Sequence, residues 1–113
     1  MGLFTRVEGI AAPEAADRLT RREAVVLDVR QELEWRAGHI RGALHIPLAH
    51  VGGQEGRLSR ETTIVTVCRS GHRSAMAARK LRRAGYEVLN LEGGMQSWAR
   101  HGLPLDPPGG RVV

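Results

Sequence analysis

The chain has 113 residues, of which 42% are hydrophobic and 26% charged, and its formal net charge is +5. This length suits one domain with a single hydrophobic core, and no apolar run is long enough for a transmembrane helix. The first eight residues are interrupted by charges and lack the apolar region of a signal peptide, so a cytoplasmic protein without a membrane partner is expected.

The positive charge is carried almost entirely by arginine, which makes up 16 of the 17 basic residues. A basic protein can bind nucleic acid, but aromatic residues make up only 4% of this chain and form no stacking pattern. The basic cluster at positions 79–83 falls on one predicted helix and is expected to face solvent. We therefore expect no nucleic-acid partner, and the charge favours small anionic substrates instead.

Helical and extended segments alternate through the first half of the chain. Residues 13–19 begin with a proline and carry an acidic residue in the first turn, which predicts a helix. Residues 24–29 are mostly apolar and predict a buried strand. They are followed by a predicted short helix at 31–37 that ends at Gly38, a short strand at 43–46 and a glycine-rich loop at 52–56.

The same alternation continues in the second half. The β-branched run 62–67 predicts a strand, and it is followed by a predicted helix at 74–84, a strand at 86–91 and a helix around 95–100. Met76, Leu81 and Trp98 are expected in the core. This order predicts an α/β fold with a parallel sheet covered on both faces by helices. Sites in such folds lie at the carboxyl ends of strands, where Asp28, Cys68 and Glu92 are expected to converge.

The only cysteine, Cys68, lies between a predicted strand and a predicted helix. Backbone N–H groups and the positive end of the helix dipole favour an anion there, and Arg69 and Arg73 add two cations. Such surroundings lower the pKa of a thiol and make it a nucleophile. A lone cysteine is more often a small buried hydrophobic residue, but this polar context favours catalysis. With no second cysteine, any group formed on Cys68 must pass to another molecule.

Three segments carry further motifs. They are Leu27-Asp28-Val29-Arg30 with Glu34-Trp35, Gly38-His39-Ile40, Gly42-Ala43 and Ile46-Pro47; Cys68-Arg69-Ser70-Gly71-His72-Arg73-Ser74; and Gly93-Gly94 with Trp98 and Gly102-Leu103-Pro104. In this order and spacing they resemble the rhodanese family and, within it, single-domain thiosulfate sulfurtransferases. The resemblance implies a single rhodanese-like domain with a five-stranded parallel sheet, assigned here to residues 1–105. Residues 106–113 are expected to form an irregular tail.

The resemblance also implies the chemistry. The Cys68 thiolate would take a sulfane sulfur from thiosulfate or another small anionic donor and carry it as a persulfide. Cyanide, a small thiol or a thioredoxin-like protein would then accept the sulfur, which implies ping-pong kinetics. No cofactor is expected, and the histidines lack the compact spacing of metal ligands.

Substrate binding is expected from Arg69, Ser70, Gly71, His72, Arg73, Ser74 and Trp35. Guanidinium groups match a sulfonate, but Arg73 is also expected to brace the loop by pairing with Asp28. Arg30 is expected to pair with a nearby carboxylate in a structural role. Ser74 either donates to the persulfide or caps the helix, and His72 either steers a substrate or is a plain loop side chain.

Two alternatives remain open at this point. Phosphatases and arsenate reductases of the same fold use a Cys-x5-Arg loop, whereas Arg73 here gives Cys-x4-Arg and Ser74 stands where their arginine would be. The shorter loop has fewer N–H groups for a tetrahedral oxyanion and suits the outer sulfur of a persulfide. The other alternative is a sulfur carrier or binding module that acts on a protein partner.

Overall fold

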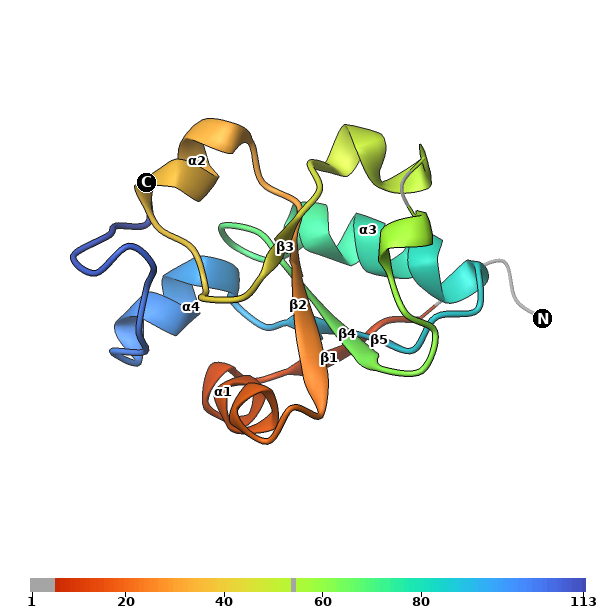
Figure 1. The fold of residues 1–113 in the computed structure, drawn as a ribbon, viewed down its shortest axis with the longest axis horizontal. Helices are drawn as coiled ribbons and strands as arrows, with labels where there is room; N and C mark the ends of the chain where they lie inside the picture. Colours follow the sequence, from red (N-terminus) through yellow and green to blue (C-terminus); the bar gives the residue numbers. More distant parts are fainter. Residues whose placement is uncertain (1–5, 54) are drawn as a thin grey trace.

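The computed structural model describes residues 6–53 and 55–113. Five parallel strands form one sheet in the order β1-β5-β4-β2-β3 (Figure 1). The strands are β1 (Glu8–Ile10), β2 (Ala24–Asp28), β3 (Leu44–His45), β4 (Thr63–Val67) and β5 (Val88–Leu91). The helices are α1 (Ala12–Thr20), α2 (Glu32–Ala37), α3 (His72–Arg83) and α4 (Gly94–Arg100), with 3-10 helices η1 (Leu48–Gly53) and η2 (Glu55–Arg57). The predicted fold class is confirmed.

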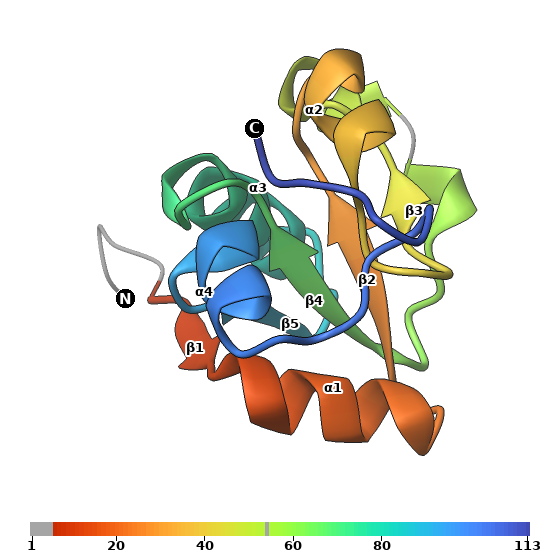
Figure 2. The same ribbon diagram turned by 90° about the vertical axis from the view of Figure 1, so that its left-hand side faces the viewer.

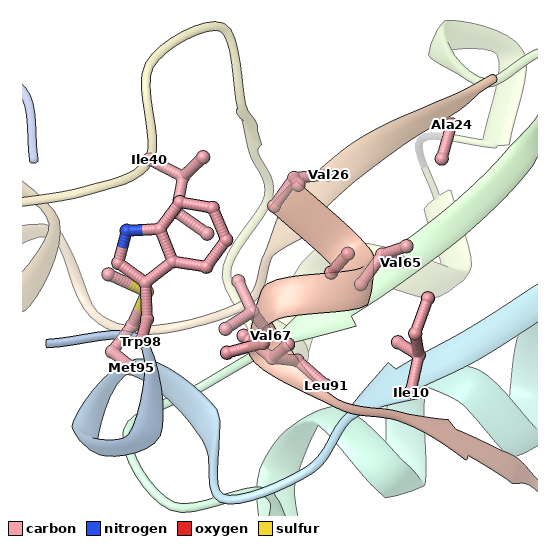
Figure 3. Close-up of a cluster of buried hydrophobic side chains, with 11 residues drawn as sticks. Ile10, Ala24, Val26, Ile40, Val65, Val67, Leu91, Met95 and Trp98 are labelled. Atoms are coloured by element: carbon pink, nitrogen blue, oxygen red, sulfur yellow. The ribbon is translucent and has the colours of Figure 1, made fainter. Parts of the chain in front are cut away.

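Each face of the sheet has its own hydrophobic core, because successive strand side chains point to opposite faces. On one face α1 and α4 pack on the sheet, with Trp98 and Met95 of α4 against apolar strand residues (Figure 3). On the other face α3 and η1 supply Leu81 and Val51. The expectation of helices on both faces is therefore confirmed (Figure 2).

Local sequence explains the elements that position the loop after β4. The run Thr63–Val67 is β-branched and almost wholly buried, as a central strand requires. Gln31 is the N-cap residue of α2, and its N–H donates to Glu34 Oε1 at 3.0 Å, which satisfies one unpaired group at the start of the helix. Helix α3 begins after Gly71, which has a φ of 114° that favours glycine.

Several boundaries and positions differ from the expectations. Strand β1 was not predicted, because it has three residues, two of them exposed. Helix α3 begins two residues early, and most of the predicted loop at 52–56 is 3-10 helix, with Gln54 outside the described residues. Met76 is 54% exposed, so its assignment to the core was wrong, whereas Leu81 and Trp98 are buried. The expectation of a cytoplasmic protein without a membrane partner was drawn from the N-terminal sequence. It rests largely on residues 1–5, which also lie outside the described part.

Residues 106–113, called the strap below, run from beyond α4 past α2 (Figure 2). The strap is irregular, yet backbone hydrogen bonds attach it to the domain. Asp106 and His39 exchange N–H···O bonds of 2.7 and 3.0 Å, and Arg111 N–H donates to Ala37 O at 2.8 Å. Val112 packs against the hydrophobic core that includes Met95 and Trp98 of α4. Within the described residues, no helix is both long and apolar enough to span a membrane.

Candidate active site

Cys68 directly follows β4 and begins a segment, residues 68–74, that ends within the first turn of α3; we call this segment the Cys68 loop. The residue is only 1% exposed. The Gly71 N–H donates to Cys68 Sγ at 3.0 Å, and the Ser74 hydroxyl donates to it at 3.3 Å. The sulfur therefore lies at the N-terminus of a helix with two hydrogen-bond donors directed at it. Ser74 is the third residue of α3, so the alternative in which it only caps the helix was wrong.

These donors decide the protonation of the thiol. Burial raises the pKa of Cys68, but the Ser74 hydroxyl and the N–H groups of Ser74, Gly71 and Ser70 outweigh burial and hold the pKa below the ordinary thiol value. The expected direction of the shift is thus supported, while its main cause is hydrogen bonding rather than the charges of Arg69 and Arg73.

Helix α4 fixes the opposite side of the loop. Its first N–H groups donate to the loop carbonyls, Met95 N–H to Cys68 O at 2.8 Å and Gln96 N–H to Arg69 O at 3.0 Å. Because these carbonyls point to α4, the N–H groups of the loop remain free for the sulfur. Such close approach requires Gly94, which has a φ of 59° and whose added Cβ would lie 2.4 Å from Cys68 O.

Asn90 of β5 holds the middle of the loop and was missed by the sequence analysis. Its amide Nδ2 donates to Gly71 O at 3.0 Å, and its Oδ1 accepts from the Thr66 hydroxyl of β4 at 3.1 Å. The available signal was a pair of polar residues inside two otherwise apolar strands. Glu92 directly follows β5 at this rim of the sheet, as expected, but it is exposed and its carboxylate lies over Gly9 of β1.

The ion pairs differ from the predicted ones. Arg73 binds Glu34 of α2 with both nitrogens, Nη1 to Oε1 at 2.7 Å and Nη2 to Oε2 at 2.8 Å. Asp28 instead accepts from Arg30 Nε at 2.9 Å and Nη2 at 2.8 Å, and both residues are fully buried. The predicted Asp28–Arg73 pair was therefore wrong, because Asp28 already has a partner two residues away. The expected carboxylate partner of Arg30 is confirmed.

The Glu34–Arg73 pair also shifts the pKa of both side chains. The hydrogen bond from Arg73 lowers the pKa of Glu34 against the opposing effect of burial. The same bond raises the pKa of Arg73 above its ordinary value. Because Glu34 Oε1 also accepts from Gln31 N–H, one carboxylate joins the start of α2 to the Cys68 loop.

The remaining predicted residues lie around this centre. Arg69 is exposed, and its Nε donates to Val113 O of the strap at 3.0 Å. Ser70 and His72 are also exposed, with Ser70 Oγ 3.4 Å from His72 Nδ1. Trp35 is stacked between two histidines, with ring centroids 3.5 Å from His39 and 4.7 Å from His45. His39 Nδ1 lies 2.8 Å from Trp35 O, so the histidine ring is held against the indole by a hydrogen bond as well as by stacking.

Other cavities do not contribute to this centre. An apolar groove of about 350 Å³ lies between α1, the Ile40–Arg41 segment and α4, and no residue of the Cys68 loop lines it. Across residues 6–53 and 55–113, no three His, Cys, Asp or Glu side chains gather where they could hold a metal ion. The reactive groups that the centre presents are a nucleophilic sulfur and its N–H and O–H donors.

A comparison with protein-family models matches residues 11–101 to the Rhodanese-like domain. The chain belongs to the rhodanese-like sulfurtransferase family. A sulfurtransferase of Allochromatium vinosum is 39% identical over 106 residues, which cover 92% of this chain and 99% of that protein. A putative sulfur carrier protein of Bacillus subtilis is 40% identical over 74 residues, 65% of this chain and 40% of that protein.

The structural comparison agrees with the sequence relatives. A rhodanese-related protein of Thermoplasma volcanium superposes with a TM-score of 0.82 at 31% identity, covering 87% of this chain and 96% of that one. The chain spans only 59% of a Synechocystis relative that is 36% identical to it. In this rhodanese-like protein, the Cys68 loop combines a nucleophile with preorganised donors for charge that develops on sulfur.

Proposed function

We propose that the protein transfers sulfane sulfur from thiosulfate or a persulfide donor to cyanide or a thiol through a persulfide on Cys68. One observation carries the proposal: Sγ of the only cysteine lies 3.0 Å from Gly71 N and 3.3 Å from Ser74 Oγ, in surroundings that lower the thiol pKa. A thiolate poised among donors is suited both to attack sulfur and to stabilise the negative charge of the product.

The reaction has two displacement steps. In the first, the Cys68 thiolate attacks the outer sulfur of thiosulfate, a new S–S bond forms, and sulfite leaves with the electron pair of the old S–S bond. In the second, cyanide attacks the outer sulfur of the persulfide and leaves as thiocyanate, which returns Cys68 to the thiolate. Neither step changes the number of protons on Cys68, so no general base is required.

The length of the loop supports sulfur over phosphorus as the reacting centre. Only four residues separate Cys68 from Arg73, and Arg73 is engaged by Glu34 through both terminal nitrogens. The next residue, Ser74, is buried and directs its hydroxyl at Sγ. Arg73 is thus committed to Glu34 rather than available to surround a phosphate at the thiol, and Ser74 supplies a hydroxyl instead of a charge, whereas a single outer sulfur needs only a few N–H and O–H donors.

The donor and the acceptor are proposed by their chemistry. Arg69 is exposed beside Cys68 and is suited to the sulfonate end of thiosulfate. Cyanide, a small thiol or a thioredoxin-like protein would serve as acceptor, and the similarity to a putative sulfur carrier protein supports a protein thiol among these. We assign no nucleic-acid or membrane partner, and we place the reaction in the cytoplasm.

The decisive experiment is the intact mass of the purified chain after incubation with thiosulfate. We expect a gain of one sulfur atom that is lost again when cyanide is added, with thiocyanate formed in the same amount. Cys68→Ala is the matched control and should gain nothing while its circular dichroism spectrum stays unchanged. A wild-type chain that gains no sulfur from thiosulfate or from a small persulfide, or a Cys68→Ala variant that still turns over, would contradict the proposal.

A further inference from the structure

The strap crosses α2 at a point where two glycines face each other. An added Cβ on Gly38 would lie 2.8 Å from both the nitrogen and the oxygen of Arg111. An added Cβ on Gly110 would lie 2.9 Å from Ala37 O and 3.1 Å from Gly38 Cα. Backbone atoms cannot give way as a flexible side chain can, so the strap occupies this path only because both positions are glycine.

Beyond this crossing the strap reaches the Cys68 loop. Val112 packs against the hydrophobic core that includes Met95 and Trp98 of α4, and the main-chain oxygen of Val113 accepts a hydrogen bond of 3.0 Å from Arg69 Nε. Arg69 is the cation next to Cys68, and it is exposed on the loop. Hence a segment far from the loop in sequence engages the side chain that is suited to a donor's sulfonate.

We propose that the strap restrains Arg69 and thereby limits the use of anionic sulfur donors. A guanidinium binds an oxyanion most strongly through two parallel N–H groups, and one such pair is formed by Nε with a terminal nitrogen. Val113 O occupies Nε, so this edge is not free while the strap is seated. Displacing the strap frees the edge and strengthens the attraction of anions to Cys68. The inference rests on the proposed function for its biological meaning, but its physical content concerns any anion that reacts with the thiol.

Alkylation of Cys68 tests the inference without sulfur transfer. The rate constants for negatively charged iodoacetate and neutral iodoacetamide are measured, and their ratio is compared between variants, because the ratio cancels changes in thiolate fraction or access. Cys68 is the only cysteine, so the reaction is unambiguous. We expect Gly110→Ala to raise the ratio about twofold to fivefold, the range of an exposed ion pair.

Three further variants make the result specific. Gly38→Ala displaces the strap from the other side of the crossing and should raise the ratio as Gly110→Ala does, which keeps the test available if one variant fails to fold. Gly53→Ala is the control, since no atom lies within 4 Å of its added Cβ, and should leave the ratio unchanged. In an Arg69→Ala background, Gly110→Ala should also leave the ratio unchanged.

Each other outcome overturns the inference. An unchanged or lower ratio in both folded crossing variants would mean that the strap does not restrain Arg69 or that it orients Arg69 favourably. A rise that persists without Arg69 would mean that the strap acts only as a barrier. The failures are separable from failure of the proposed function, because a wild-type chain that takes up no sulfur still gives an alkylation ratio. If sulfur is taken up, the KM for thiosulfate should fall in the crossing variants by the same factor as the ratio rises.

Discussion

At Cys68, neutral hydrogen-bond donors stabilise the thiolate more than the neighbouring cations do. Ser74 places its hydroxyl 3.3 Å from Sγ and is itself fully buried, so water cannot replace it. The two arginines of the loop are engaged elsewhere, Arg69 with Val113 and Arg73 with Glu34. Nucleophilicity at neutral pH therefore depends on the exact shape of a seven-residue loop more than on the net charge around it.

Ser74→Ala should raise the pKa of Cys68 and slow sulfur transfer at neutral pH. The variant removes a hydrogen bond to a charged group, which corresponds to about a tenfold loss of rate. The pH dependence of iodoacetamide alkylation measures the pKa. Ser70→Ala is the control, because the Ser70 hydroxyl contacts His72 Nδ1 rather than the sulfur. A Ser74→Ala variant with an unshifted alkylation profile would remove the hydroxyl from this role.

Asn90→Ala should loosen Gly71 and so weaken the N–H bond to Sγ. We expect the pKa of Cys68 to rise and the free energy of unfolding to fall by about 1–2 kcal/mol, the cost of a lost buried hydrogen bond. Thr66→Val should also raise the pKa of Cys68 and lower the free energy of unfolding. The effect on the pKa should be smaller, because Thr66 acts only through Asn90. If Asn90→Ala lowers stability without moving the alkylation profile, the residue supports the fold but does not position the loop.

Much of this centre could be predicted from residue types in the sequence, but its partners could not. The position of Cys68 between a strand and a helix was enough to predict a lowered pKa. The pairing of Arg73 was mispredicted because both Asp28 and Glu34 are reasonable carboxylates, and only the packing of α2 distinguishes them. Asn90 was missed because a polar residue in a strand of Leu and Val gives no sign of which loop it faces.

At the scale of elements, α4 and α2 hold the Cys68 loop from two sides. Helix α4 receives the carbonyls of Cys68 and Arg69 on its first N–H groups, and α2 holds Arg73 through Glu34. The contacts of α4 satisfy N–H groups that the helix itself leaves unpaired, whereas the contact of α2 is an ion pair between side chains. Single substitutions can remove each contact separately, so the contribution of each helix to the free energy of unfolding can be measured on its own.

Gly94→Ala should destabilise the protein by about 3–5 kcal/mol, since it adds a collision with Cys68 O to the strain of a positive φ. Gly102→Ala is a matched control, because Gly102 has a similar φ of 68° and no atom within 4 Å of its added Cβ. That variant should lose only about 1 kcal/mol, the strain alone. Chemical denaturation measures both. Equal losses would show that α4 does not need to approach the loop so closely.

Glu34→Gln should reduce stability by about 1 kcal/mol at neutral pH, since the pair with Arg73 is partly exposed. The side-chain oxygen that accepts from Gln31 N–H is retained, so the start of α2 is preserved. Because folding lowers the pKa of Glu34, its contribution is fully present above the unfolded value of about 4.3 and is lost as pH falls through the lower folded value. The difference between wild type and variant should therefore shrink in acid.

The pH series needs a charge-matched comparison. Glu32→Gln removes a carboxylate from the same helix, but its pair with Arg36 is mostly exposed and should contribute much less. Free energies of unfolding of the three proteins, measured from neutral pH into acid, give the result. A gap between wild type and Glu34→Gln that stays constant in acid would mean that the Arg73 pair does not stabilise the folded state.

Helices and strands could be predicted where the spacing of apolar residues agreed with the residue types of the segment. They could not be predicted where segments were short. The strands at 24–29 and 62–67 and the helix at 13–19 have strong patterns, and the structure places β2, β4 and α1 there. Strand β1 has three residues with one buried side chain, so it exists through pairing with β5 rather than through its own propensity. The strap was recognisable as irregular from its prolines and glycines, but nothing in its composition indicated the contact with Arg69.

At the scale of the whole molecule, the centre is assembled from segments that are far apart in the chain. Glu34 comes from α2, Asn90 from β5, and Val113 from the strap, and all three contact the Cys68 loop. Because β4 and β5 are central strands, the loop reaches its final shape only when most of the sheet has formed. The protonation of Cys68 is therefore linked to global folding.

This linkage predicts a stability difference between wild type and Cys68→Ser that depends on pH. Folding lowers the pKa of Cys68, so the thiolate contributes stability that is fully present above the unfolded value of about 8.5 and is lost as pH falls through the folded value. The free energy of unfolding of wild type minus that of the variant should increase as pH rises between these two values. Urea unfolding curves across the neutral to alkaline range measure it, and a flat or falling difference would contradict the lowered pKa.

The burial of Cys68 has a consequence for regiochemistry. A persulfide offers a nucleophile two sulfur atoms, and attack on the inner one would release hydrosulfide and leave the acceptor bonded to the protein. A nucleophile attacks sulfur in line with the bond that breaks, so attack on Sγ of the persulfide requires approach from the side opposite the outer sulfur. The side from which the donor delivered the outer sulfur is then occupied by that atom, and Cys68 is otherwise buried, with 1% exposure. Enclosure thus directs every acceptor to the one atom whose attack moves sulfur onward, and it makes a mixed disulfide with the protein a disfavoured product.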